Sequence, residues 1–123
     1  MTVPRNGLGL PKSARVKQRR DFELVRTKGR RLTSGCLIAN WLALPAEARS
    51  RLGVITSRKV GPATVRNRAR RLLRETFRRH QHELTGPATI VLVARASIAG
   101  KPFNAVERDY LTALRRAGLL RTC

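Results

Sequence analysis

One segment, Ser57–Arg79, constrains the fold of this chain more than any other. It reads S-R-K-V-G-P-A-T-V-R-N-R-A-R-R-L-L-R-E-T-F-R-R, and at about 100° per residue its apolar positions share one stripe, about two-fifths of a helix's circumference. The stripe consists of Val65, Ala69, Leu72, Leu73, Thr76 and Phe77. Because such a stripe must be buried, the rest of the chain has to supply a core that covers one side of this helix.

The other sides of the same predicted helix are crowded with arginine. Away from the stripe lie Asn67, Arg70, Arg71, Arg74 and Arg78, with Arg66 and Arg68 on the flanks and Arg58 and Lys59 just before the helix. Glu75 is the only acidic residue of the segment. Like charges at helical spacing repel each other, and a solvated face normally mixes both signs. The crowding therefore favours an anionic partner over simple exposure to water.

The composition of the whole chain indicates that this partner is nucleic acid. The 123 residues fit one domain with a modest core, and their formal net charge is +20. Only five of the 27 basic residues are lysines. Guanidinium groups bind two phosphate oxygens at once or stack on a base, so an arginine-rich surface suits structured nucleic acid. Codon bias is an alternative explanation of the arginine-to-lysine ratio, although it does not explain the total charge.

Several other classes of protein are disfavoured by what the sequence lacks. No stretch approaches the roughly 20 apolar residues of a spanning helix, and no apolar signal segment follows Met1, so we expect a cytoplasmic protein without a membrane partner. Cys36 and Cys123 have neither metal-ligand spacing nor the density of a disulfide scaffold. We find no P-loop or dinucleotide motif and therefore expect no small-molecule substrate.

A histidine pair raises the alternative of a self-sufficient nuclease. His80 and His82 are candidates for acid–base chemistry, but they lie at the predicted end of a helix, where an imidazolium complements the helix dipole. The chain has only seven acidic residues, too few and too scattered to suggest a metal-dependent nuclease site. We therefore predict no catalytic residue and no metal ligand in the protein.

The chain is predicted to form one domain over residues 18–123, preceded by a mobile basic arm over residues 1–17 that is rich in glycine and proline. A short helix is expected over Arg19–Lys28, ended by Gly29. Two strands, Leu32–Leu44 and Arg51–Ser57, are expected to form an antiparallel pair.

The second half of the chain alternates between helix and strand. Gly61-Pro62 is expected to open the arginine-rich helix and Gly86-Pro87 to close it. The apolar run Thr89–Ala94 predicts a strand at the centre of the sheet. Asn104 and Glu107 have the spacing of a capping box for a last helix that ends before Gly118. The residues alone thus predict the order α, β, β, α, β, α.

A longer pattern identifies a family. The segment S-R-K-V-G-x-A-x-V-R-N-R-x-R-R-L-x-R-E-x-F-R closely resembles the signature of the bacterial ribonuclease P protein subunit, the small basic partner of the catalytic RNA that removes 5′ leaders from precursor tRNA. Further matches are R-R-D-F-x-x-V-x-x-x-G from Arg19 to Gly29, R-L-G-V from Arg51 to Val54, and the apolar strand that ends before Arg95. Together they cover most of the chain from Arg15 to Leu120.

The resemblance implies an α+β fold of order αβββαβα around a mixed sheet, ribosomal-protein-like with a left-handed crossover, in which the long first strand is split or strongly bent. It also implies that the arginine helix contacts the catalytic RNA and that a cleft between the first helix and the sheet holds the single-stranded leader. The implied RNA-binding residues are Arg58, Lys59, Arg66, Asn67, Arg68, Arg70, Arg71 and Arg74. The implied leader-binding residues are Phe22, Arg26, Ile38, Asn40 and Ile55.

The chain departs from the family pattern within that cleft. Arg26 stands where relatives often carry a second aromatic residue, and Asn40 stands where they often carry a tyrosine, with Trp41 adjacent. A guanidinium plane also stacks on bases, so Arg26 is a substitute platform. For Phe22, ordinary core packing is an alternative and compatible role.

The function implied is that of a non-catalytic subunit of an endoribonuclease, with precursor tRNA as substrate and with hydrolysis performed by the RNA and its Mg²⁺. A ribosomal or other structural RNA-binding protein is the alternative, because it shares the charge and size of this chain.

Overall fold

The computed structural model describes Arg15, Val16 and residues 18–121. In this part of the chain the main elements are α1 (Arg19–Lys28), β1 (Arg30–Ser34), β2 (Leu37–Ala43), β3 (Arg51–Ile55), α2 (Ala63–His80), β4 (Ala88–Ala94) and α3 (Phe103–Arg116). Short 3-10 turns lie at Arg58–Val60 (η2), Gln81–Glu83 (η3) and Ala96–Ile98 (η4). The order αβββαβα is confirmed. The predicted arm lies outside the described residues except for Arg15 and Val16, which run beside β3.

The sheet is mixed, with the strand order β1-β2-β4-β3. β1 pairs antiparallel with β2, β2 pairs antiparallel with β4, and β3 pairs parallel with β4. The prediction of a direct pair between the first two apolar segments is therefore wrong, because β4 lies between β2 and β3. A strand whose residues are apolar on both faces buries the most surface at an inner position, which explains why β4 occupies it.

The predicted long strand over Leu32–Leu44 is also wrong as a single element, since it is two strands joined by a tight turn. Gly35 has φ 54°, a left-handed conformation that glycine adopts without strain. A Cβ at Gly35 would collide with the carboxylate of Asp109 on α3. That carboxylate accepts a hydrogen bond from the backbone N–H of Cys36 (3.0 Å), so the turn is tied to α3.

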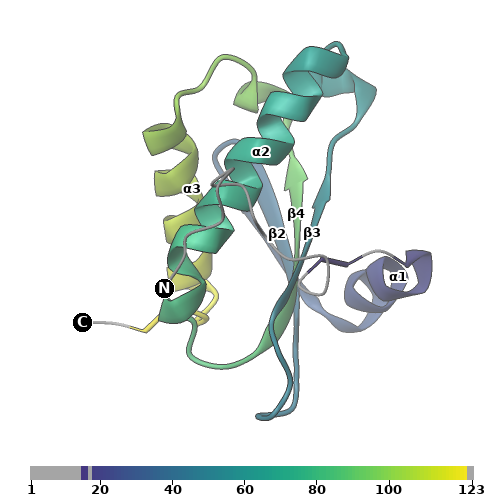
Figure 1. Ribbon diagram of the computed structural model, residues 1–123, viewed down its shortest axis with the longest axis vertical. Helices are drawn as coiled ribbons and strands as arrows, with labels where there is room; N and C mark the ends of the chain where they lie inside the picture. The colour runs from purple at the N-terminus through teal and green to yellow at the C-terminus, as the bar shows by residue number, and fades with distance from the viewer. Residues whose placement is uncertain (1–14, 17, 122–123) are drawn as a thin grey trace, which may run out of the picture.

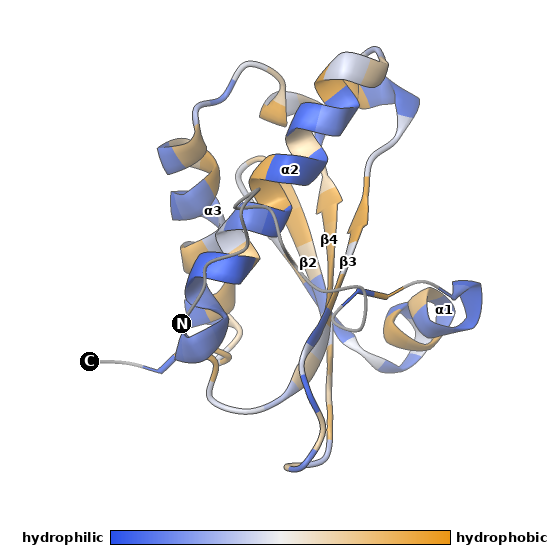
Figure 2. Cartoon of the chain, viewed as in Figure 1, coloured by the Kyte–Doolittle hydropathy of each residue, from blue (hydrophilic) through white to orange (hydrophobic). Residues whose placement is uncertain are grey.

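Helices cover both faces of the sheet, as Figure 1 shows: α2 and α3 lie on one side and α1 lies on the other. The main core lies between the sheet and the α2–α3 pair. It includes Leu37, Ile90 and Leu92 of the sheet, Leu73 and Phe77 of α2, and Val106, Tyr110 and Leu114 of α3. The apolar stripe predicted for α2 is confirmed, with Ala69, Leu73, Thr76 and Phe77 buried. In Figure 2 the central strands are mostly hydrophobic, whereas hydrophilic residues dominate α2.

Two predicted helix ends need correction. α2 begins directly after Pro62, as expected, but it ends at His80 and passes into η3, well before Gly86-Pro87. α3 begins after Pro102 without a side-chain cap, so the capping box of Asn104 and Glu107 does not form. Glu107 instead accepts a hydrogen bond from His80 of α2, and this contact between two helices takes the place of the predicted local one.

Candidate RNA interface

The exposed surface of α2 carries arginines that have no acidic partner. Within residues 18–121, no carboxylate forms an ion pair with Arg66, Arg68, Arg70, Arg71 or Arg74. Glu75 is occupied by Arg78 (2.6 Å) and Arg79 (2.8 Å), nearer the end of the helix. Arg58 and Lys59 are exposed in η2, just before α2. We call this surface the arginine face; its members are Arg58, Lys59, Arg66, Asn67, Arg68, Arg70, Arg71 and Arg74.

Internal hydrogen bonds orient part of the arginine face. Asn67 Oδ1 accepts a bond from Arg70 Nη1 (2.7 Å), so the amide fixes the direction of a neighbouring guanidinium. Arg68 Nη2 donates to the backbone carbonyl of Lys101 (2.9 Å) and ties α2 to the segment before α3. Arg68 therefore has a structural contact that the sequence did not reveal.

The crowding of positive charges affects the pKa of Arg74. Burial lowers the pKa of this guanidinium from its ordinary value, and the charges of Arg15 and Arg70 lower it further. A lowered pKa means that the surroundings disfavour the positive charge. An anion bound beside Arg74 would offset that effect.

On the opposite side of the sheet, a groove of about 220 Å³ lies between α1 and the strands. Its floor is built in register: Ile38 of β2 lies opposite Val93 of β4, which lies opposite Ile55 of β3. Asn40 lies opposite Val91 in the next row on the same face. The five leader-binding residues implied by the resemblance, Phe22, Arg26, Ile38, Asn40 and Ile55, all line this one groove.

The walls of the groove are held by specific contacts. A Cβ on Gly53 would lie 2.6 Å from Cε1 of Phe22, so the absence of a side chain on β3 lets the phenyl ring lie against the strand. Arg26 donates to Glu23 one turn earlier on α1 (2.5 Å), which holds its guanidinium on the rim. The amide of Asn40 donates to the carbonyl of Val91 (3.4 Å).

Not all residues of the groove were predicted from the sequence, and Trp41, the neighbour of Asn40, lies outside the groove. Arg31 of β1, which lies opposite Asn40, adds a second guanidinium, and Val91 and Val93 supply the centre of the floor. Trp41 packs against the core between the sheet and the helices, because successive residues of a strand point to opposite faces. Trp41 therefore does not supply an aromatic side chain to the groove.

Comparisons with known proteins assign the family. The family model described as Ribonuclease P matches residues 10–118. The chain belongs to the ribonuclease P protein family. It is 38% identical over 110 residues to the ribonuclease P protein component of Syntrophomonas wolfei (89% of this chain, 92% of the relative), and 39% identical over 112 residues to that of Desulfovibrio desulfuricans (87% and 85%).

Solved structures agree with the fold. The RNase P protein of Staphylococcus aureus matches with a TM-score of 0.81 at 24% identity, covering 89% of this chain and 100% of that one. The RNase P protein of Thermotoga maritima matches with a TM-score of 0.74 at 31% identity, covering 83% and 96%. The arrangement of three helices around a mixed four-stranded sheet is therefore that of ribonuclease P proteins.

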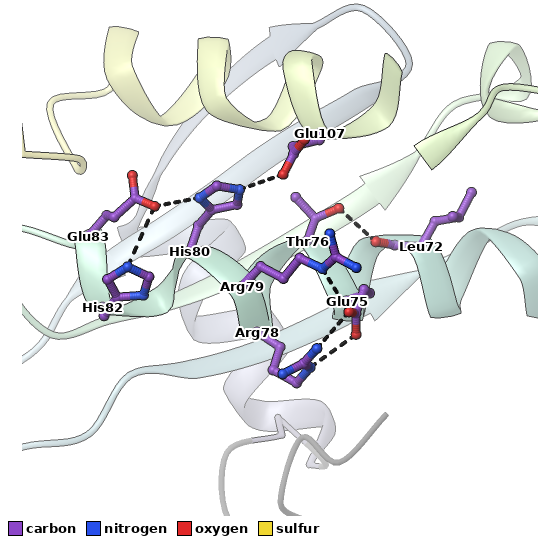
Figure 3. Close-up of polar contacts among 9 residues, drawn as sticks. All are labelled: Leu72, Glu75, Thr76, Arg78, Arg79, His80, His82, Glu83 and Glu107. Atoms are coloured by element: carbon purple, nitrogen blue, oxygen red, sulfur yellow. Dashed lines mark hydrogen bonds and ion pairs between the residues drawn. The ribbon is translucent and has the colours of Figure 1, made fainter. Parts of the chain in front are cut away.

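In this ribonuclease P protein, the histidine proposed as an alternative nuclease residue has a structural role. His80 Nδ1 bonds Glu83 of η3 (2.5 Å), and Nε2 bonds Glu107 of α3 (2.7 Å), as Figure 3 shows. The imidazole also lies near the ring of Tyr110, with centroids 6.4 Å apart. Both ring nitrogens are engaged by carboxylates, so His80 joins the end of α2 to η3 and α3. His82 is largely exposed, and only a 3.8 Å contact links it to Glu83.

The His80 cluster predicts a pH-dependent stability. Burial disfavours the charged imidazole, but the bonds to Glu107 and Glu83 outweigh it and raise the pKa of His80 above its ordinary value of 6.5. A raised pKa in the folded state stabilises the protein fully below pH 6.5, and this contribution is lost as the pH rises through the raised value. We expect a loss of about 1 kcal/mol, or about 4 °C in Tm, over that rise.

A His80→Gln variant should lack this alkaline loss, whereas the exposed His82→Gln control should keep it, as measured by thermal unfolding from pH 5 to 9. Glu83 acts in the other direction, because the bond to His80 lowers its pKa and its contribution is lost in acid. Equal pH profiles for the wild type and His80→Gln would show that the His80 cluster does not cause the pH dependence of stability.

Neither a metal-binding cluster nor a membrane-spanning helix is found among the described residues. Within them, no group of three or more His, Cys, Asp or Glu side chains is placed to hold a metal ion. No helix among them is both long and apolar enough to cross a membrane.

Proposed function

We propose that this chain binds the catalytic RNA of ribonuclease P through the arginine face and holds the 5′ leader of precursor tRNA in the groove beneath α1. The observation that carries the proposal is that Phe22, Arg26, Ile38, Asn40 and Ile55 all line one groove. The arginine face, whose α2 arginines have no carboxylate partner among the described residues, adds a second basic surface. As the protein component of ribonuclease P, the chain is a subunit of a ribonucleoprotein endoribonuclease.

The groove suits a single strand of RNA. Its floor is apolar apart from Asn40. Its walls carry one aromatic ring, the guanidinium groups of Arg26 and Arg31, and the carboxylate of Glu23, which is paired with Arg26. Unpaired bases expose faces that stack on rings and guanidinium planes, whereas the faces of paired bases are hidden in the duplex. A leader is single-stranded, and mature tRNA lacks it. The groove therefore supports selection of precursor over product.

The proposal assigns the chemistry to the RNA. The described residues do not provide a metal-binding cluster, so they do not fit Mg²⁺, and we derive no metal-dependent step on the protein. What the chain supplies is positive charge, which lowers the repulsion between the phosphates of the two RNAs and so raises the affinity for substrate. We place this activity in the cytoplasm.

Reconstitution tests the proposal. Added to a bacterial ribonuclease P RNA, at a magnesium concentration at which the RNA alone cleaves slowly, the protein is expected to restore removal of the 5′ leader from precursor tRNA. An unrelated basic protein of similar size and charge is the control, because it screens phosphates without providing the groove.

The two alternatives give different results in the same assay. A structural RNA-binding protein would bind RNA but leave leader removal no faster than the control does. A self-sufficient nuclease would cut precursor tRNA without any added RNA and would lose this activity in a His80→Ala, His82→Ala variant. Either result would overturn the proposed function.

A further inference from the structure

A second hollow, of about 480 Å³, lies at the outer edge of β3. Leu52, Gly53 and Val54 of β3 form its floor. Arg15 enters it from the N-terminal segment, and Arg74 enters it from α2. We call it the β3-edge pocket. It brings together two guanidinium groups that are 59 positions apart in the sequence.

The position of Arg15 is fixed by its backbone. Val16 N–H donates to the carbonyl of Leu52 (2.9 Å), so this short segment extends the sheet beyond β3 in the parallel direction. Arg51 Nη2 donates to the carbonyl of Arg15 (3.3 Å) and also contacts Asp21 (3.5 Å). The side chain of Arg15 is partly buried, and its Nε atom is fully covered without a hydrogen-bond partner among the described residues.

The charges at this pocket are uncompensated. Among Arg15, Val16 and residues 18–121, no carboxylate forms an ion pair with Arg15, Arg70 or Arg74. Asp21, the acid on nearby α1, is directed to Arg51 instead. Burial lowers the pKa of Arg74, and the nearby charges of Arg15 and Arg70 lower it further. Positive charges this close together repel each other, and an anion bound between the guanidinium groups of Arg15 and Arg74 would offset that repulsion.

The pocket continues into the groove beneath α1. Phe22 lines both hollows, and its ring lies against Gly53, a floor residue of the β3-edge pocket. Val16 closes over the same glycine, since a Cβ there would lie 3.2 Å from its Cβ. The edge of β3 is thus the place where the groove on one side of the sheet meets the arginine face on the other.

We infer that Arg15 and Arg74 form a binding site for one backbone phosphate of the RNA strand that occupies the groove. The base next to this phosphate would lie beside Phe22, and the two arginines would donate to the phosphate oxygens from opposite sides. The inference rests on the proposed function for the presence of a single strand in the groove. It adds a residue, Arg15, that lies outside the arginine-helix signature, and it assigns Arg74 of the arginine face to the leader strand and not to the catalytic RNA.

Neutral linkages in the leader test the site. Precursor tRNAs carrying a single methylphosphonate at successive leader positions are bound to the reconstituted holoenzyme, and each affinity is compared with that of the unmodified substrate. In the wild type, one position is expected to cost about five- to tenfold, the effect of a charge-assisted hydrogen bond at a partly exposed site. In Arg15→Met and in Arg74→Met, the neutral linkage at that same position should cost nothing further.

Arg108→Met is the matched control, since it removes one exposed charge from α3, and it should keep the full effect of the sensitive linkage. If Arg15→Met disturbs the edge of the sheet, Arg74→Met still reports on the site from α2. If the methylphosphonate effect disappears in Arg74→Met but persists in Arg15→Met, the two arginines do not bind the same phosphate. Equal sensitivity in all four proteins would overturn the site itself.

The phosphate could also come from the catalytic RNA, and a further arm separates the two sources. Affinity for that RNA alone should be the same for Arg15→Met and Arg108→Met. A selective loss with Arg15→Met, together with no sensitive leader position, would overturn the assignment to the leader strand. Failure of the proposed function would look different, because the wild-type protein would then neither restore leader removal nor bind the precursor in preference to mature tRNA.

Discussion

Replacing Arg66, Arg70 and Arg71 together with glutamine is expected to lower the affinity of the protein for the catalytic RNA by about 100-fold or more at about 0.1 M salt, because three charge-assisted phosphate contacts are lost. The affinity should also depend less on salt, with a log–log slope smaller by about two to three. These three are chosen because none pairs with a carboxylate among the described residues, whereas Arg68 also holds the backbone of Lys101. Filter binding over a salt series measures both quantities.

A matched triple variant distinguishes a defined face from total charge. Arg108, Arg115 and Arg116 are exposed on α3, and replacing them with glutamine changes the net charge by the same amount. The α3 variant should keep most of the affinity, and both variants should unfold thermally within a few degrees of the wild type. Equal losses of affinity in the two variants would show that charge acts diffusely and that α2 has no special role.

The two surfaces differ in how far they could be predicted from the sequence. The arginine face follows from local periodicity alone, since the same segment contains both the buried stripe and the charges, and Ala69, Leu73 and Phe77 are buried as expected. The hydrogen bond from Arg68 to Lys101 could not be predicted, because it joins residues 33 positions apart through a backbone carbonyl. Contacts of this kind depend on where the helix is placed and leave no pattern in the sequence.

The groove depends on strand order, which local patterns do not specify. Ile38 and Asn40 could be placed on one face of their strand by alternation. Only the insertion of β4 between β2 and β3 puts Val91 and Val93 beside them. The apolar character of β4 predicted an inner position in the sheet, but it did not predict that β4 lies between β2 and β3. Arg31 and Arg15 were missed because each reaches its hollow through a strand pairing that forms only in the folded sheet.

Replacing Phe22 with leucine is expected to reduce the preference of the holoenzyme for leader-bearing over mature tRNA by about 10- to 100-fold, the range expected for the loss of one stacked base. Leucine keeps an apolar side chain against Gly53 and removes only the aromatic plane, so thermal stability should change little. Phe22→Tyr is the matched control, because it keeps the plane. The measurement is the ratio of the two dissociation constants in the reconstituted holoenzyme, with the wild type as reference.

The ratio of the two dissociation constants distinguishes between two roles of Phe22, packing against β3 and stacking on a base of the leader. If the ring only packs against β3, Phe22→Leu binds both tRNAs as the wild type does, because the leucine still fills the space above Gly53. If the ring is a stacking platform, affinity for mature tRNA stays constant while affinity for the precursor falls, since only the precursor places a base in the groove. Phe22 is the only aromatic side chain among the described residues that line the groove. Its replacement should therefore remove most of the stacking contribution.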